Sequence, residues 1–373
     1  MNVRRVVLVC TLALASMTVA RSGHELPVYP SYYPHEIEIQ TVAPERAAVM
    51  LLGGQIHAYV GSEPRFAGVV PEAIRTVESL GSFVLIRVNP SSPRAGDEQA
   101  ACAIGSTVLR SIAVQPGGLI VHPYPVTPLH GDYLHHVDRA EAAKARLLGA
   151  PPSPAPVTGL KVKAEGFASS LVPPGWNADG TEWDAEIAEV RLSDLLAQHT
   201  VALNGWQGPA WIRSGWFHAQ LLLADQTAMH PDLKPLQADA FDSALDRINL
   251  ERDLVATLAA GCRTMIAGYR LRRETINTEF STGIENIAFD ALSGLHSPMF
   301  IRTAKLKDFP WNGWLSLGIE SRPQAAWNPI AGFTDTYGRL MWFALGDPAT
   351  VPSPYDDAQV LNRISDIEPA GRK

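Results

Sequence analysis

The sequence lacks several short patterns that would assign a chemistry directly. It contains three cysteines and no Cys-x-x-Cys pair, which excludes thioredoxin-like redox and zinc-ribbon motifs. It has no Gly-x-Ser-x-Gly nucleophile elbow, no phosphate-binding P-loop and no Gly-x-Gly-x-x-Gly dinucleotide fingerprint. The sequence therefore gives no support to an α/β-hydrolase or to nucleotide chemistry.

Long apolar runs are missing as well, except at the amino terminus. Arg4 and Arg5 precede an uncharged, mostly apolar stretch from Val6 to Ala20. This layout is typical of a secretory signal peptide, and the run is too short to span a bilayer comfortably. We predict that residues 1–20 are a Sec-type signal peptide cleaved near Ala20. The protein is then periplasmic or secreted and soluble, with no membrane insertion after cleavage.

Basic residues are outnumbered by acidic ones. The predicted leader holds two of the 31 basic residues and none of the acidic ones, which leaves a net charge of −9 for the remainder. Because basic patches dominate the affinity for nucleic acids and anionic membranes, this balance argues against both as partners.

Cysteine is scarce, and Cys102 and Cys262 are the two that remain after the predicted cleavage. In an oxidising compartment they have the opportunity to form a disulfide. Two buried free thiols that act as small hydrophobic side chains are the alternative. The sequence leaves both possibilities open.

Tryptophan is absent from the first 170 residues, whereas nine tryptophans follow. Between the two regions, residues 150–159 hold four prolines in ten positions, which is typical of a linker. We therefore predict an α/β domain over residues 21–149 and a proline-rich linker over 150–160. A tryptophan-rich α+β domain follows over 161–347, and a loose tail over 348–373.

The first half alternates between strand-like and helix-like segments. Strands are expected at 36–42, 55–60, 82–88 and 119–122, and helices at 44–52, 71–80 and 98–114. This alternation predicts an α/β lobe with a mostly parallel sheet and flanking helices.

The second half predicts a mainly antiparallel α+β domain. A helix is expected over 236–260, and a hairpin turn over 336–339. Strands are expected at 265–270, 284–289, 299–306, 314–319, 331–334 and 340–344.

The opening of the α/β region resembles a known family. A strand and a helix lead into Leu52-Gly53-Gly54, and then into the short strand Ile56-His57-Ala58. This order resembles the start of type 2 periplasmic binding proteins, the solute-binding components of ABC importers, over about residues 36–89. The resemblance implies an exported protein that captures a small-molecule solute, needs no cofactor and works with a membrane permease.

Ligands of such folds meet the loops that follow the strands. The resemblance therefore implies contacts from Tyr59, Gly61 and Ser62 after one strand, and from Asn89 and Ser91 after another. A simple turn at Gly61 and Ser62 is the alternative.

A histidine-rich segment over residues 122–138 is the chemically richest part of the chain. In one interpretation its side chains hydrogen-bond a ligand, the candidates being His122, Tyr124, His130 and Tyr133. In another they hold a divalent metal (Zn, Cu or Fe), the candidates being His122, His130, Asp132, His135 and His136. A purely structural role is the third interpretation.

These observations favour an exported solute-binding protein over an enzyme, without deciding between the two. The first alternative is a metal-dependent periplasmic enzyme or redox accessory protein that uses the histidine-rich segment. The second is a structural partner in an envelope complex, which would be recognised through tryptophan-bearing loops such as residues 306–314.

Overall fold

The computed structural model describes twelve stretches of the chain. They are residues 34–115, 117–150, 155–178, 180–197, 210–224, 233–238, 240–279, 282–309, 313–324, 335–345, 349–353 and 358–361. The predicted signal peptide and the strand expected at 331–334 lie outside these stretches. Within them, no helix is long and apolar enough to cross a membrane.

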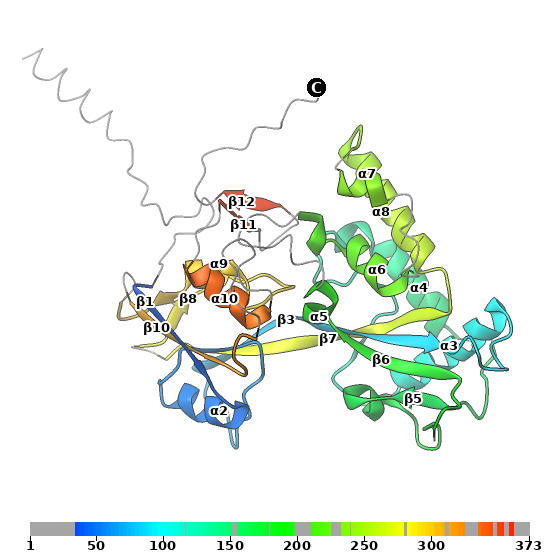
Figure 1. The fold of residues 1–373 in the computed structure, drawn as a ribbon, viewed down its shortest axis with the longest axis horizontal. Coiled ribbons are helices and arrows are strands. Elements are labelled where there is room, and N and C mark those ends of the chain that lie inside the picture. The colour runs from blue at the N-terminus through cyan, green and yellow to red at the C-terminus, as the bar shows by residue number, and fades with distance from the viewer. Residues whose placement is uncertain are drawn as a thin grey trace, which may run out of the picture.

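One eight-stranded sheet organises the molecule (Figure 1). Seven strands follow one another in the order β1 (Glu36–Thr41), β10 (Trp314–Ile319), β2 (Ala58–Val60), β7 (Thr264–Asn277), β3 (Ile74–Val88), β6 (Ala185–Arg191) and β5 (Val162–Ala164). The eighth strand, β4 (Ile120–Val121), is not part of this linear order and pairs with β7.

Strands β3 and β7 are the longest, and they pair with each other antiparallel along most of their length. Figure 1 shows that they run from one side of the molecule to the other and carry a group of elements at each end. Lobe 1 denotes the group around β1, β2 and β10, and lobe 2 the group around β4, β5 and β6. The two lobes therefore share one continuous pair of strands.

Lobe 1 has helices on both faces of its strands (Figure 1). Helix α2 (Pro44–Leu52) covers one face and buries Ala47 and Leu51 against Ile56 and Tyr59. Helices α9 (Pro298–Thr303) and α10 (Thr336–Leu345) cover the other face. A small two-stranded antiparallel sheet of β8 (Ile284–Asn286) and β9 (Lys305–Leu306) lies beside them.

Lobe 2 packs helix α3 (Glu98–Ala113) against β3, β6 and β7. Asp97 caps the first turn of α3 by accepting from the Ala100 amide, and Ile104 and Val108 are among the residues that the helix buries. A second apolar core lies among the remaining helices of this lobe. They are α4 (Val137–Leu148), α5 (Leu192–Ala197), α6 (Gly215–Leu223), α7 (Leu233–Gln237) and α8 (Ala244–Leu258).

A disulfide joins Cys102 on α3 to Cys262, which lies two residues before β7. The two cysteines are 160 positions apart, so the bond links the two halves of the sequence within lobe 2. The sequence left open whether these cysteines form a disulfide or remain free thiols, and the structure shows the disulfide.

The sheet is mixed, and the expectation of a mostly parallel sheet was wrong. β1, β10 and β2 pair parallel, as do β5 and β6, but β7 is antiparallel to β2, β3 and β4. The long partner of β3 lies nearly 200 residues further along the chain, so the strands that flank β3 in the sheet are not those that flank it in the sequence.

Five local predictions were also wrong. Residues 71–80 belong largely to β3 and are not a helix, because β-branched Ile74, Thr76 and Val77 pair with β7. Residues 340–344 and the expected turn at 336–339 form α10, whose first turn is capped by Asp335 accepting from the Gly338 amide. Residues 299–306 form most of α9 and then β9, and the helix expected over 236–260 divides into α7 and α8.

Both halves of the sequence contribute to the one sheet, on either side of residues 150–160. The described tryptophans of the second half lie in different surroundings. Trp216 is fully buried among the helices of lobe 2, Trp176 packs on the α3 core, and Trp314 is exposed. The region expected to be a loose tail includes strands β11 (Thr350–Pro352) and β12 (Gln359–Leu361), which pair antiparallel.

Candidate functional site

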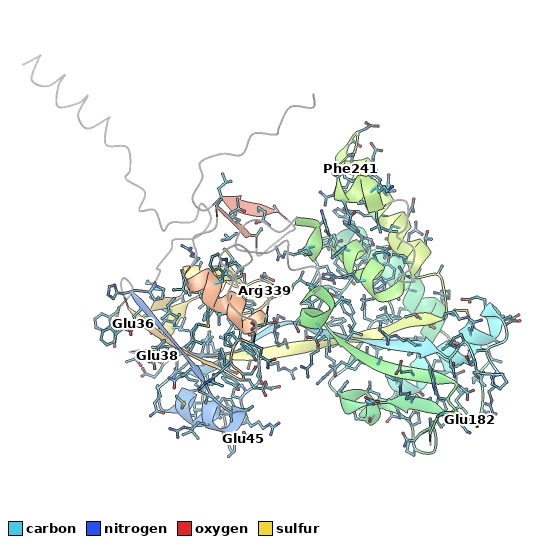
Figure 2. All side chains as sticks on the ribbon, viewed as in Figure 1. Glu36, Glu38, Glu45, Glu182, Phe241 and Arg339 are labelled. Carbon is cyan, nitrogen blue, oxygen red and sulfur yellow. A yellow bond between two sulfur atoms is a disulfide. The ribbon has the colours of Figure 1, made fainter. Side chains whose placement is uncertain are left out.

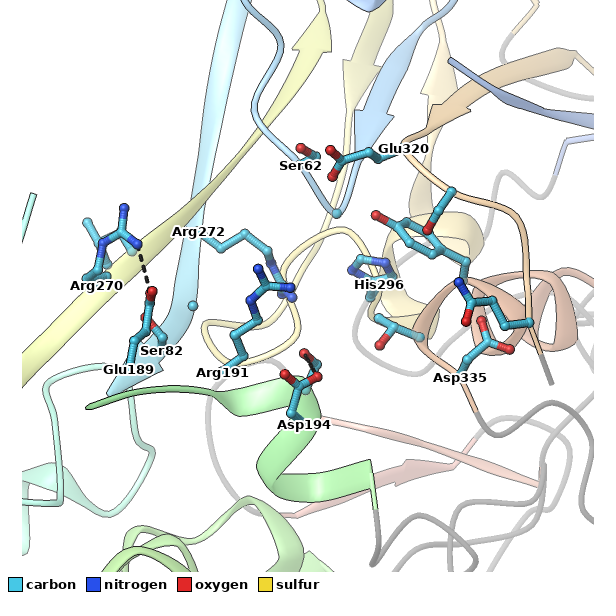
Figure 3. Close-up of a pocket in the computed structure, with 18 of the residues that line it drawn as sticks. Ser62, Ser82, Glu189, Arg191, Asp194, Arg270, Arg272, His296, Glu320 and Asp335 are labelled. Atoms are coloured by element: carbon cyan, nitrogen blue, oxygen red, sulfur yellow. Dashed lines mark hydrogen bonds and ion pairs between the residues drawn. The ribbon is translucent and has the colours of Figure 1, made fainter. Parts of the chain in front are cut away.

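A cavity of about 430 Å³ lies between the two lobes, above the middle of β3 and β7 (Figure 3). Its lobe 1 wall comes from the residues that follow β2 and β10 and from the start of α10. Its lobe 2 wall comes from the end of β6 and the start of α5. Since β2 and β10 are parallel, their carboxyl ends meet at this rim, where open α/β sheets bind their ligands. The volume lies within the range of small-molecule sites.

The floor of the cavity is an irregular part of the sheet. The β3–β7 register shifts between Leu80 and Ser82, and Gly81 and Ser82 both line the cavity. A Cβ on Gly81 would lie 2.9 Å from the Arg272 amide nitrogen, so the close approach of the two strands requires glycine here.

The loop after β2 is held by a buried carboxylate. Glu274 on β7 is fully buried, and its two oxygens accept from the amides of Gly61 and Leu295 at 2.6 and 2.7 Å. Burial raises the pKa of Glu274, while the Arg272 guanidinium and the two amide donors oppose this rise. Glu274 thus connects the floor of the site to two loops of its lobe 1 wall.

His296 lines the cavity beside this carboxylate (Figure 3). Its side chain is only 7% exposed, and Nδ1 lies 3.5 Å from Oε1 of Glu274. Neither ring nitrogen meets a well-aligned hydrogen-bond partner within the described part of the chain. Burial lowers the pKa of His296 well below its usual value, and the nearby Arg272 and Arg339 add to this effect. The ring is therefore neutral and has a donor and an acceptor available for a ligand.

Charged side chains of both signs line the cavity in equal numbers. The cations are Arg191, Arg270, Arg272 and Arg322, and the anions are Glu189, Asp194, Glu320 and Asp335.

Several of these charges are engaged within the protein. Arg270 donates to Glu189 at 2.7 Å, and Ser82 donates to the same carboxylate oxygen at 2.6 Å. Arg272 donates to the hydroxyl of Ser79 and to the carbonyl oxygens of Leu292 and Ser293. These groups build the floor of the site.

Four charges face the cavity with no ion pair to another described residue. Arg191 and Asp194 belong to lobe 2, and Glu320 and Arg322 belong to lobe 1. Each wall thus offers one unpaired cation and one unpaired anion, and a solute that carries both signs can satisfy charges on both lobes at once.

Of the residues that the family resemblance indicated, the structure places Gly61 and Ser62 on the cavity wall. Gly61 has a φ of +86°, which favours glycine, so the turn interpretation also describes its backbone. Tyr59 is fully buried and donates to the Val42 carbonyl oxygen. Asn89 donates to the Trp183 carbonyl oxygen and accepts from the Ser91 amide, away from the cavity.

The histidine-rich segment lies in lobe 2, and its residues are not among those that line the cavity between the lobes. His122 packs against the rings of Tyr124, Tyr133 and Tyr269. Its Nε2 also lies 2.9 Å from the Val126 carbonyl oxygen. Tyr124 is buried, and its hydroxyl lies 3.1 Å from Nδ1 of His136.

Other members of the segment meet protein partners too. His130 Nε2 lies 2.8 Å from Nδ1 of His218 on α6, and Asp132 accepts from the Gly215 amide at 2.9 Å. His135 is exposed. In the described stretches, the only cluster of three or more metal-ligand side chains is Glu98 with the disulfide-bonded Cys102 and Cys262. The five candidate metal ligands do not form such a cluster.

Sequence reasoning missed most of the cavity wall, including Arg191, His296 and Glu320. The position of Glu320 directly after the strand at 314–319 was a usable signal, since that strand was predicted correctly. No comparable signal marked His296, because its neighbours in the cavity are distant in sequence.

Comparison with known proteins gave matches among solved structures. The chain is similar to the peptide-binding protein AppA from Clostridium difficile, with 11% identity and a TM-score of 0.41 over 70% of this chain and 58% of that chain. It is also similar to the oligopeptide-binding protein AppA from Bacillus subtilis in complex with a nonapeptide. There the identity is 16% and the TM-score 0.38, over 71% of this chain and 59% of that chain.

A third similar structure is the ABC transporter-associated periplasmic binding protein DppA from Helicobacter pylori in complex with the peptide STSA. The identity is 12% and the TM-score 0.36, over 70% of this chain and 54% of that chain. The chain thus spans less than two thirds of each of these structures. No family model and no curated protein matches the chain.

Proposed function

We propose that this protein is an exported solute-binding protein, the capture component of an ABC-type importer or a derivative of one. The observation that carries the proposal is the cavity between the two lobes, which is lined by charged groups from both. Its place at the carboxyl ends of β2 and β10 supports ligand binding there. A membrane permease is the partner that this function requires.

The solute is a small polar molecule that carries both a positive and a negative group. Arg191 and Arg322 attract an anionic group, and Asp194 and Glu320 attract a cationic one. Gly61 and Ser62 approach the solute from the loop after β2, and His296 adds a neutral donor and acceptor. Engagement of both walls would hold the lobes around the solute.

Thermal unfolding in the presence of a panel of solutes tests this function. The panel contains free amino acids, di- and tripeptides, and simple organic acids and amines. A solute at one hundred times its Kd adds about 2.7 kcal/mol to the free energy of unfolding. We expect a zwitterionic solute to raise the melting temperature, and NMR of the recovered solute to show it unchanged. Chemical conversion of the solute would instead indicate an enzyme.

Two variants connect the binding to this cavity. Arg191→Met changes the lobe 2 wall and Glu320→Gln changes the lobe 1 wall, and we expect each to weaken binding at least tenfold. Arg65→Met is the control, because Arg65 is an exposed residue that pairs with Glu45 outside the cavity. Unchanged binding in both wall variants would contradict the proposed site.

A further inference from the structure

A second cavity, of about 480 Å³, lies at the other end of the lobe 1 strands. Gly313 and Trp314 at the start of β10 line it, together with His57, which directly precedes β2. The cavity between the lobes lies at the opposite ends of these strands, where Gly61 and Glu320 follow them. Trp314 and Glu320 are six positions apart along and just beyond β10, a distance of roughly 20 Å. The two cavities are therefore separate sites.

Exposed aromatic rings distinguish this second cavity. Twelve large hydrophobic side chains are exposed in the described part of the chain, and only Phe309 and Trp314 among them are aromatic. Phe309 is 66% exposed, Trp314 is 69% exposed, and both line this cavity together with the buried Leu306. Two aromatic faces in one hollow favour a ligand that rests against the π-surface of the rings.

The charges around the rings are negative. Asp308 lines the cavity, and its carboxylate has no ion pair with any other described residue. Glu36 is exposed and lies beside Trp314 in the parallel register of β1 and β10, and Glu38 follows on the same face of β1. Figure 2 shows Glu36 and Glu38 along this outer edge of lobe 1.

The nearby lysines are engaged by protein groups. Lys305 pairs with Glu285 at 2.7 Å, and Lys307 donates to the Thr278 carbonyl oxygen at 2.9 Å. Burial lowers the pKa of His57, and its Nδ1 accepts from the Ser316 amide, so this ring is neutral. The described lining of the cavity thus combines aromatic faces and a carboxylate with no lysine or arginine.

We propose that this cavity is a second binding site, which takes a small organic cation with an apolar body, such as a quaternary ammonium compound. The cationic group rests against Trp314 and Phe309 and is attracted by Asp308, while the apolar body packs on Leu306. Aromatic faces attract cations through the ring quadrupole, and a neighbouring carboxylate adds a Coulombic attraction. The site does not depend on the function proposed for the cavity between the lobes.

A matched pair of probes tests the charge preference. Choline and 3,3-dimethylbutan-1-ol have nearly the same shape, and only choline carries a positive charge. NMR titration of the full chain with each probe measures both affinities. We expect millimolar binding of choline, at least fivefold tighter than that of the alcohol. Equal affinities, or no binding of choline up to 50 mM, would overturn the proposal.

Variants of exposed residues locate the site without disturbing the core. We expect Trp314→Ala to weaken choline binding about tenfold, Asp308→Asn about threefold, and Trp314→Phe less than Trp314→Ala. Leu134→Ala is the control, because Leu134 is an exposed apolar residue of lobe 2. Glu320→Gln, which removes a carboxylate of the cavity between the lobes, should leave choline binding unchanged. Choline binding that survives Trp314→Ala but is lost in Glu320→Gln would assign the cation to the cavity between the lobes and overturn the second site.

Discussion

His130 donates a hydrogen bond from Nε2 to Nδ1 of His218 at 2.8 Å, and the surrounding groups fix this direction. Nε2 of His218 lies 3.1 Å from the Ile212 carbonyl oxygen, which only accepts, so that nitrogen carries the proton and Nδ1 is an acceptor. At the other end, the Thr127 amide donates to Nδ1 of His130 at 3.0 Å. Both rings are therefore neutral, each with one donor and one acceptor in use.

This chain of hydrogen bonds predicts acid-sensitive folding. Burial lowers the pKa of His218 to about 4, and it lowers the pKa of His130 as well. Above about pH 6.5 both rings are neutral in the folded and the unfolded state, and the full stability is present. Below that pH the two imidazoles bind protons in the unfolded chain but remain unprotonated in the folded chain. The free energy of unfolding then falls as the pH drops from 6.5 to 4, by roughly 3 kcal/mol for His218 alone.

Urea unfolding at pH 7.5, 6 and 4.5 measures this loss. In His218→Gln the amide can accept from His130 and donate to Ile212 without titrating. We expect this variant to lie within about 1 kcal/mol of the wild type at pH 7.5 and to show a shallower pH dependence. His218→Leu leaves both partners unsatisfied, and we expect it to lose about 2–4 kcal/mol at pH 7.5. An unchanged pH slope in His218→Gln would contradict the assignment.

The Cys102–Cys262 disulfide predicts a large effect of reduction. Closing a loop of 160 residues restricts the unfolded chain, and the chain-entropy relation gives about 5 kcal/mol as an upper value. We expect the Cys102→Ser, Cys262→Ser double variant to lose about 2–5 kcal/mol in urea unfolding. Dithiothreitol should destabilise the wild type by a similar amount and leave the double variant unaffected. A wild type that is indifferent to the reductant would contradict the bond.

Gly61→Ala should lower the free energy of unfolding by more than the backbone strain of its positive φ alone, because the new methyl group would clash with the cavity wall. A Cβ on Gly61 would lie 2.7 Å from His296 and 2.8 Å from Tyr337. Gly175 is a matched control, since its φ is +83° and a Cβ there meets nothing within 4 Å. We expect Gly175→Ala to cost about 1–2 kcal/mol from backbone conformation. Gly61→Ala should cost more and should also weaken solute binding, measured by calorimetry with a solute found in the thermal screen. Equal losses in the free energy of unfolding of the two variants would contradict the expected clash and show that His296 and Tyr337 move aside.

Glu274→Gln should weaken both the fold and the site. An amide in place of the carboxylate turns an acceptor into a donor that faces either the Gly61 or the Leu295 amide. We expect a loss of about 1–3 kcal/mol in urea unfolding. Ser169→Ala is a control for a hydrogen bond of the exposed surface, where the Ser169 hydroxyl donates to the Ala164 carbonyl oxygen, and it should change stability by less than about 1 kcal/mol. Similar losses in the two variants would argue against a special role for Glu274.

Local elements with strong signals could be predicted from the sequence. The helix at Pro44–Leu52 was predicted with its observed bounds, because Pro44 and Gly53 mark its ends, and the strand at Trp314–Ile319 was also correct. A helix was wrongly predicted over residues 71–80 because Pro71 and Gly81 resemble the residues that begin and end a helix. Their partner strand begins at Thr264, and no local pattern reports a pairing over that separation.

The candidate site was harder to predict. Gly61 and Ser62 could be found because they follow a strand directly, whereas a charged residue such as Arg191 at a strand end resembles any solvent-exposed residue. The histidine-rich segment was a strong compositional signal, and the structure shows its imidazoles in contact with protein groups such as His218 and Val126. Sequence spacing alone does not distinguish such an internal network from a ligand site.

The long pair of strands has a consequence for any attempt to divide the molecule. A backbone break between Ala113 and Leu160 would leave β3 on one fragment and β7 on the other, so neither fragment could complete the sheet alone. The same break would leave one cysteine of the disulfide on each fragment. A nicked chain would therefore migrate as a single covalent species until it is reduced, and its separated fragments would regain structure only by recombining.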